Sequence, residues 1–222
     1  MSEDLFGGSF RKERRRVRKK RIRNERYKDR KYRSVFLAFM TILLAFAVYF
    51  VSQIEPVKKN YIYPYRYQEL VTLYAEANGV SPALVASVIM HESKFSNQAH
   101  SSRGAVGLMQ LMPETAEWIA GQLGEEDFSL EKLREPEMNI RYGTWYLALL
   151  EREFDGNPIL TLAAYNAGRG TVHEWMEERG WSANFNDISA IPYPETRLYV
   201  GRVLKDKKHY ETLYHPTREN GN

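Results

Sequence analysis

Apolar residues are most concentrated in one uninterrupted run near the start of the chain. Residues 34–52, SVFLAFMTILLAFAVYFVS, contain no charged side chain. As an α-helix, these 19 residues would span roughly 28 Å, about the thickness of the hydrocarbon core of a bilayer. A cleaved secretory signal is the alternative, but its apolar region is usually about 7–15 residues long and ends at small residues. The run therefore predicts a single, retained transmembrane helix.

Beyond this run, the polar and apolar positions follow a helical pattern. Proline is favoured in the first turn of a helix, serine and asparagine just before it, and glycine just after the last turn. The residues that carry these signals are Ser81, Pro82, Pro113, Asn157, Pro158 and Gly168. No alternating run long enough for a confident strand follows residue 66. We therefore predict an all-α domain, with helices that begin at the three prolines.

These patterns divide the chain into five segments. They are a tail at 1–33, a transmembrane helix at 34–52, a linker at 53–65, a helical domain at 66–215 and a short tail at 216–222. The chain has 222 residues, of which 43% are apolar, so one domain of this length can build a sizeable core.

Charge is distributed unevenly along the chain. Residues 11–33 hold 15 Lys and Arg against three acids, a balance of +12, whereas residues 34–222 hold 17 basic and 23 acidic side chains, a balance of −6. Lys and Arg collect on the cytoplasmic side of a membrane helix. We therefore expect 1–33 in the cytoplasm and the helical domain outside, and we expect no nucleic-acid binding by this acidic domain. The chain has no cysteine, which excludes disulfides and thiolate metal sites.

A carboxyl group on an apolar helix face is the first candidate for chemistry. Three aliphatic side chains lie within about 60° of Glu92 on a helical wheel: Val85, Val88 and Ile89. Glutamate is rarely buried without a partner, because burying its charge is costly. Glu92 is therefore either a structural residue paired with Arg141 or Arg197, or a functional acid.

Two further segments have the composition of a binding cleft. Residues 101–116, SSRGAVGLMQLMPETA, combine glycines that allow close backbone approach, adaptable methionines and the amide of Gln110. Tyr165 and Asn166 precede Gly168 at the expected end of a helix. A sugar has apolar faces and hydroxyl edges, so this mixture suits a saccharide, although a Tyr-Asn pair before a glycine is also ordinary helix termination.

Five motifs in order carry a family resemblance. They are HESKF at 91–95, GAVGLMQLMPETA at 104–116, NIRYGTWYL at 139–147, AAYNAG at 163–168 and IPYPETRLYV at 191–200. Together they strongly resemble the lytic transglycosylases of the goose-lysozyme-like fold, here in a membrane-anchored form. The resemblance covers about residues 66–205, and the anchor and the basic tail lie outside it.

The resemblance implies a set of site residues. Glu92 matches the catalytic acid, and Tyr165 matches the tyrosine that faces it. The residues that the resemblance implies for substrate binding are Ser101, Gln110, Met112, Tyr165, Asn166 and Glu195. The Asn-Pro pair that usually follows the glutamate is Ser96-Asn97 here, which puts only the local loop geometry in doubt.

The resemblance also implies a reaction on peptidoglycan. Such an enzyme cleaves the MurNAc-β-1,4-GlcNAc bond without water and leaves 1,6-anhydro-MurNAc ends, with the glycan strand as its substrate. Glycoside cleavage usually requires two carboxylates. Glu114 and Glu117 are expected on a surface helix, so no second catalytic carboxylate is evident beside Glu92. This favours a mechanism in which the substrate's own acetamido group takes the place of the second carboxylate. We expect neither a cofactor nor a metal. The five histidines have no ligand spacing with nearby carboxylates, and they are His91, His100, His173, His209 and His215.

Three other functions stay open at this level. A lysozyme-like muramidase would use the same site but transfer the sugar to water. A wall-binding module would hold glycan without cutting it, although such a module is expected to have lost Glu92. In the third reading, the basic tail makes the chain a membrane-tethered nucleic-acid or lipid binder, but the tail interleaves few aromatics with its Lys and Arg.

Overall fold

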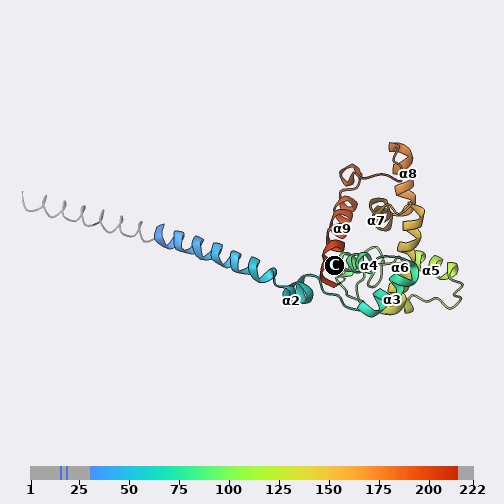
Figure 1. Ribbon diagram of the computed structural model, residues 1–222, viewed down its shortest axis with the longest axis horizontal. Helices are drawn as coiled ribbons and strands as arrows, with labels where there is room; N and C mark the ends of the chain where they lie inside the picture. Colours follow the sequence, from blue (N-terminus) through green and yellow to red (C-terminus); the bar gives the residue numbers. More distant parts are fainter. Residues whose placement is uncertain (1–15, 17–18, 20–30, 215–222) are drawn as a thin grey trace, which may run out of the picture. The chain divides into compact units, whose positions relative to one another are not determined.

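The computed structural model describes residues 16, 19 and 31–214 (Figure 1). The chain divides into two compact units, Met1–Val57 and Lys58–Asn222. In the first unit, a helix of 22 residues, Lys31–Ser52, contains an 18-residue stretch with a mean hydropathy of 2.5 and no buried residue, and the short helix α2 (Glu55–Val57) follows it. By length and composition, the 22-residue helix is able to cross a membrane. The predicted tails at 1–33 and 216–222 lie almost entirely outside the described residues.

The second unit is built from helices (Figure 1). They are the π-helix η1 (Lys58–Ile62), α3 (Gln68–Asn78), α4 (Pro82–Ser93), α5 (Pro113–Gln122), the 3₁₀ helix η2 (Lys132–Arg134), α6 (Pro136–Glu153), α7 (Pro158–Ala167), α8 (Arg169–Arg179), the 3₁₀ helix η3 (Ile188–Ala190) and α9 (Pro194–Tyr214). Within the described residues no strand forms, and only two isolated bridges occur in the loop before α5. The all-α prediction is confirmed.

Proline starts most of the long helices. The predicted starts at Pro82, Pro113 and Pro158 are confirmed, and α6 and α9 begin at prolines as well. Before α7, the Asn157 side chain accepts hydrogen bonds from two backbone N–H groups of the first turn, 2.9 and 3.0 Å long. Ser81 has extended backbone angles before α4, but its hydroxyl makes no capping bond. Gly168 ends α7 at a φ of 94°, which a residue with a Cβ rarely adopts.

Part of the expected linker packs as a piece of the helical unit. The Tyr214 hydroxyl, at the end of α9, donates to the carbonyls of Lys59 and Tyr63 at 3.1 and 2.7 Å. The Tyr210 hydroxyl donates to the Pro64 carbonyl at 2.9 Å. From Lys58 onward the chain is therefore held against α9 by three hydrogen bonds, rather than being a free connector.

Two hydrophobic clusters make up the interior. The larger surrounds α4, which packs against α9 and is buried on all sides from Ala83 to Ile89. The smaller lies between α5, η2 and α6 and includes Ile119 and Leu133. Tyr146 on α6 packs against both clusters. The space between the two clusters is where side chains from distant helices converge.

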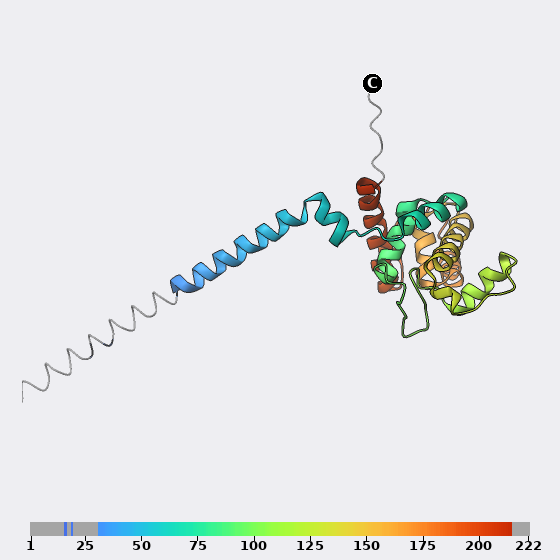
Figure 2. The ribbon, with the colours of Figure 1, turned by 90° about the horizontal axis from the view of Figure 1, so that it is seen from below.

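A long loop, seen in green in Figure 2, connects α4 to α5. It is held by the fully buried Asn139 on α6, whose Nδ2 donates to the carbonyls of Val106 and Leu133, both at 2.9 Å. The Met109 N–H donates to Asn139 Oδ1 at 2.7 Å. One side chain thus satisfies three buried backbone groups and fixes the loop without a strand or a helix.

Gly107 allows this close approach. A Cβ on Gly107 would lie 2.2 Å from Asn139 Nδ2, and its φ is +81°. Gly104, in the same loop, has a φ of +95° but open space where a Cβ would be. A Cβ at Gly104 would therefore introduce backbone strain alone, whereas a Cβ at Gly107 would introduce both strain and steric overlap.

We expect Gly104→Ala to lower the free energy of unfolding by about 1 kcal/mol, because the left-handed conformation is strained for alanine. Gly107→Ala adds the displacement of Asn139 and should cost about 2–4 kcal/mol more. All four tryptophans, at 118, 145, 175 and 181, lie in the helical unit, so their fluorescence in a urea titration measures this unit. Equal losses for the two variants would contradict the bracing role of Asn139.

Candidate active site

A cleft of about 410 Å³ opens between the two clusters. Its lining includes every residue singled out from the sequence: Glu92, Ser101, Gln110, Met112, Tyr165, Asn166 and Glu195. They come from the end of α4, the loop before α5, the end of α7 and the first turn of α9. Residues up to about 100 positions apart in the chain therefore share one cavity.

Glu92 lies in the last turn of α4 with a largely buried carboxyl. Burial raises its pKa from 4.5 to about 7, since the charged form loses hydration. Neither arginine that could have neutralised it does so: Arg141 pairs with Glu125, and Arg197 donates to the Ile191 carbonyl at 2.8 and 3.2 Å. The predicted alternative, an ion pair of Glu92 with Arg141 or Arg197, is therefore wrong. The group is poised to exchange a proton near neutral pH.

Two tyrosines lie beside this carboxyl. Burial and the neighbouring Glu92 charge raise the pKa of both Tyr165 and Tyr199 well above 10, so both stay protonated. The Tyr165 hydroxyl donates to the Met109 carbonyl at 2.8 Å. The Tyr199 hydroxyl interacts with Glu92 strongly enough to offset part of the rise in its pKa, yet this buried hydroxyl completes no hydrogen bond of regular geometry. The Tyr199 hydroxyl therefore lies close to the carboxyl whose charged form it stabilises.

The loop presents a hydroxyl, an amide and a thioether to the cleft. The Ser101 oxygen accepts from the Ala105 N–H at 3.0 Å, which leaves the Ser101 hydroxyl hydrogen available to a ligand. Gln110 has a φ of +49°, and its Nε2 donates to two loop carbonyls at 2.9 and 3.2 Å, which fixes the side chain. Within residues 31–214 nothing donates to the Gln110 amide oxygen. Met112, 36% exposed, adds apolar surface at the rim.

The opposite wall is formed by α7 and α9. Thr196, buried in the first turn of α9, donates to Asn166 Oδ1 at 2.8 Å and so fixes the orientation of that amide. Glu195 precedes it, exposed at the rim. Glu114 and Glu117 are also exposed but do not line the cleft. Glu92 and Glu195 are therefore the two carboxylates of the cleft lining.

Sequence reasoning missed several residues of this region. Arg103, Thr115 and Tyr146 line the cleft, and Tyr199 lies beside Glu92. Tyr199 is within the quoted IPYPETRLYV motif, so the motif held the signal, but its position relative to Glu92 required the packing of α4 on α9.

The two residues that flank Glu92 have structural partners. His91 Nε2 lies 2.8 Å from an Asp206 carboxylate oxygen, and the Ser93 hydroxyl donates to the Leu108 carbonyl at 2.7 Å. Across the described part of the chain, no three His, Cys, Asp or Glu side chains converge as metal ligands would. His215 lies outside that part.

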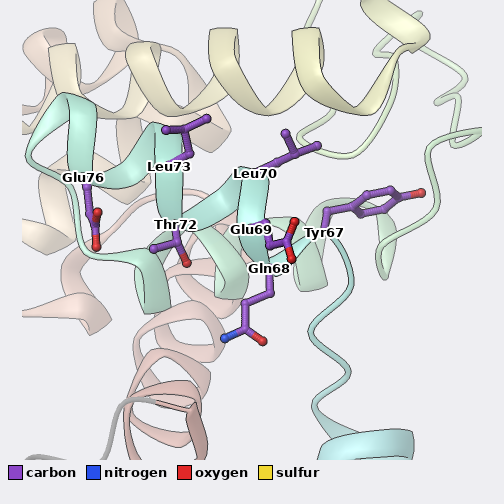
Figure 3. A pocket seen from close by; sticks show the side chains of 7 residues that line it. All are labelled: Tyr67, Gln68, Glu69, Leu70, Thr72, Leu73 and Glu76. Atoms are coloured by element: carbon purple, nitrogen blue, oxygen red, sulfur yellow. The ribbon is translucent and has the colours of Figure 1, made fainter.

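A second hollow, of about 910 Å³, runs along α3 (Figure 3). Its seven lining residues are consecutive or nearly so, from Tyr67 to Glu76. Glu69 and Glu76 are two helical turns apart, about 10 Å along the axis. Because one helix supplies every group, no set of polar side chains converges there, and the hollow does not have the geometry of a catalytic site.

The fold and the cleft define an all-α protein with one buried, protonatable carboxyl among amides, hydroxyls and apolar surface. The model of the Transglycosylase SLT domain matches residues 69–188, which is more than half of the chain, so the chain belongs to this family. The family prediction is confirmed.

Similar proteins have names that agree with this family. The soluble lytic murein transglycosylase of Salmonella typhimurium is 37% identical over 153 residues, which cover 67% of this chain and 23% of that protein. Membrane-bound lytic murein transglycosylase C of Haemophilus ducreyi is 32% identical over 169 residues, 65% of this chain and 45% of that protein. The chain thus spans about a quarter of the length of the soluble relative and under half of the membrane-bound one.

Solved structures have the same fold. An inactive mutant of lytic transglycosylase Slt from Pseudomonas aeruginosa superposes with a TM-score of 0.65 at 31% identity, covering 73% of this chain and 26% of that one. The 70 kDa soluble lytic transglycosylase of Escherichia coli gives 0.62 at 34% identity, covering 68% and 25%.

We expect Glu92→Gln to stabilise the helical unit at high pH. As pH rises from 4.5 to about 7, the unfolded carboxyl ionises while the folded one resists, so unfolding becomes easier by up to about 3 kcal/mol. Glutamine removes this penalty. The variant should match the unmodified chain near pH 4 and exceed it by up to about 3 kcal/mol near pH 8 in urea titrations. Glu117→Gln controls for the lost charge, and an equal gain in that variant would show that burial is not the cause.

Tyr199→Phe should raise the pKa of Glu92 above about 7, because the hydroxyl that partly stabilises the carboxylate is removed. We expect a shift of up to about one pKa unit. An NMR titration of the Glu92 carboxyl carbon measures the shift, and this signal is assigned by its absence in Glu92→Gln. Tyr146→Phe, which removes a different hydroxyl of the cleft, is the control. A pKa that is unchanged or lower in Tyr199→Phe would refute the interaction.

Proposed function

We propose that this chain is a membrane-anchored peptidoglycan lytic transglycosylase that cleaves the MurNAc-β-1,4-GlcNAc bond and leaves 1,6-anhydro-MurNAc ends. The observation that carries the proposal is Glu92, a carboxyl in a cleft with a pKa of about 7, which forms an ion pair with no Lys, Arg or His of residues 31–214. Such a group is protonated often enough to act as an acid at neutral pH and ionised often enough to act as a base.

The names of the relatives support the same substrate. They are murein transglycosylases, and a 70 kDa soluble lytic transglycosylase has also been solved in complex with bulgecin A. The Pseudomonas aeruginosa structure carries a glutamate-to-glutamine substitution and is described as inactive, which agrees with one indispensable glutamate in this fold.

In the first step, protonated Glu92 donates its proton to the glycosidic oxygen, and the bond from that oxygen to C1 of the muramic residue breaks. The GlcNAc hydroxyl leaves with the proton. The 2-acetamido oxygen of the muramic residue stabilises the positive charge at C1. This assignment follows from the cleft lining, because its other carboxylate, Glu195, is exposed at the rim rather than buried beside Glu92.

In the second step, the ionised Glu92 takes the proton of the C6 hydroxyl, whose oxygen bonds to C1 and closes the anhydro ring. The acetamido group is released and Glu92 is again protonated, so no water is consumed. The buried Tyr199 hydroxyl can donate to the carboxylate between the two steps, when Glu92 carries a charge. This temporary support agrees with its lack of a fixed partner.

The remaining residues bind and orient the sugar in this proposal. Ser101 and Gln110 offer a hydroxyl hydrogen and an amide oxygen, and Met112 offers apolar surface. Asn166, held by Thr196, offers its amide nitrogen. Glu195 contacts hydroxyl groups from the rim.

We further propose that the Lys31–Ser52 helix anchors the protein in a bacterial cell membrane as a single span. The excess of Lys and Arg before it supports an N-terminus in the cytoplasm and a helical unit on the side of the cell wall. This orientation brings the proposed enzyme to its substrate.

A muramidase is the alternative, since the same acid could activate water in place of the C6 hydroxyl. We expect the full chain in detergent to release, from purified peptidoglycan, muropeptides lighter by one water than reducing-end muropeptides, as measured by mass spectrometry. Glu92→Gln should release none, because no other buried carboxyl of the described cleft can replace it.

Glu117→Gln, which changes an exposed carboxylate outside the cleft lining, is the matched control and should retain activity. Reducing-end products would establish the muramidase. An inert chain that still binds peptidoglycan would indicate a wall-binding module.

A further inference from the structure

An exposed tryptophan lies at the edge of the cleft. Trp118 on α5 is 40% exposed, although tryptophan is generally among the more buried residues. Its ring is 6.5 Å from that of Tyr146, which lines the cleft, and Tyr146 is 5.8 Å from Tyr165. The three aromatic rings form a continuous row from the side of Glu92 to the surface.

Two neighbours in sequence show that this row continues the cleft. Thr115 lines the cleft, and Trp118 follows it by three positions on α5, hence on the same helix face. Gly168 lines the cleft too, and the guanidinium of the adjacent Arg169 lies 5.9 Å from the centre of the Trp118 ring. The surface around Trp118 is therefore reached by moving along the wall of the cleft.

The position of Trp118 is held by its surroundings. Trp145 packs against it edge to face, with ring centres 5.9 Å apart. Arg169 is itself fixed by an ion pair with Glu153 at 3.2 Å. An aromatic ring held in place loses little conformational entropy on binding, which favours a recognition role over a mobile surface side chain.

We propose that Trp118, with Tyr146 and Arg169, forms an additional sugar subsite that binds the glycan strand next to the residues being cleaved. The inference rests on the proposed function, and it assigns a ligand to surface beyond the 410 Å³ cleft. The C–H groups on the face of a pyranose ring pack on the electron-rich face of an indole, while Arg169 can donate hydrogen bonds to hydroxyl or carboxylate oxygens at the sugar's edge.

A glycan strand is favoured over a protein partner at this position. The exposed aromatic surface is a single ring beside a charged arginine, and not the broad apolar patch that a protein interface requires. When part of a glycan strand occupies the cleft, the sugars linked to that part extend along the walls of the cleft. A subsite in line with the cleft therefore lies where the next sugar of the strand would be.

The test measures affinity for peptide-free glycan strands of peptidoglycan, using the full chain in detergent with Glu92→Gln to prevent cleavage. Trp118→Ala should weaken binding of long strands about 3- to 10-fold, with a smaller change for disaccharides, which are too short to occupy both the cleft and the surface beyond it. Trp118→Phe should recover much of the loss. Trp118→Leu, which keeps apolar bulk without an aromatic ring, should not.

Tyr61→Ala is the control for removing an exposed aromatic. Tyr61 is 82% exposed. It lies between Lys59 and Tyr63, whose carbonyls accept hydrogen bonds from Tyr214, the last residue of α9. Glu195 of the cleft lining, by contrast, is in the first turn of α9. This variant should bind strands as the parent does. Circular dichroism melting checks folding, and if Trp118→Ala is unfolded the Leu and Phe pair decides the question.

The outcomes separate the two proposals. Unchanged affinity for long strands in Trp118→Ala or Trp118→Leu would overturn the subsite, as would equal losses for long strands and disaccharides. Product release from peptidoglycan by the unmodified chain is measured in parallel. Cleavage together with unchanged strand affinity refutes the subsite alone, whereas failure to cleave refutes the proposed function.

Discussion

The hydrogen bonds of one buried amide, Asn139, hold the segment on which the cleft depends. Its three bonds to backbone groups connect α6 to the loop before α5 and to η2. Because the loop is fixed there, the Met109 carbonyl can accept from Tyr165, and Gln110 can adopt its left-handed conformation toward the cleft. An irregular segment thus has the rigidity that catalytic side chains normally obtain from helices.

The larger hydrophobic cluster offsets the loss of stability caused by burying Glu92. Burying an unpaired Glu92 disfavours the folded state at neutral pH, and the surrounding structure must exceed that penalty. α4 can do so because it is surrounded by apolar side chains over two turns, and because the Ser87 hydroxyl is satisfied by the Val203 carbonyl at 2.8 Å. The fully buried part of α4 therefore lies in the turns directly before the group whose pKa burial raises.

Features that depend on neighbouring residues could be predicted from the sequence, whereas features that depend on contacts between distant segments could not. Proline positions marked the helix starts, and a carboxyl on an apolar stripe marked Glu92, because both depend on a few neighbouring residues. The placement of Tyr199 and Tyr146 depends on which faces of α9 and α6 turn toward α4, which periodicity does not specify. The five motifs suggested that the site residues share one cleft, but the hydrogen bonds that orient Ser101 and the other loop residues could not be predicted from them.

The packing of Lys58–Tyr65 against α9 has a geometrical consequence. The chain enters the helical unit beside Tyr210 and Tyr214, while Glu195, at the rim of the cleft, is in the first turn of the same helix. A helix of 21 residues is about 30 Å long. In the proposed function, a polymer that leaves the cleft past Glu195 is thus separated by the length of this helix from the segment through which the chain enters the unit.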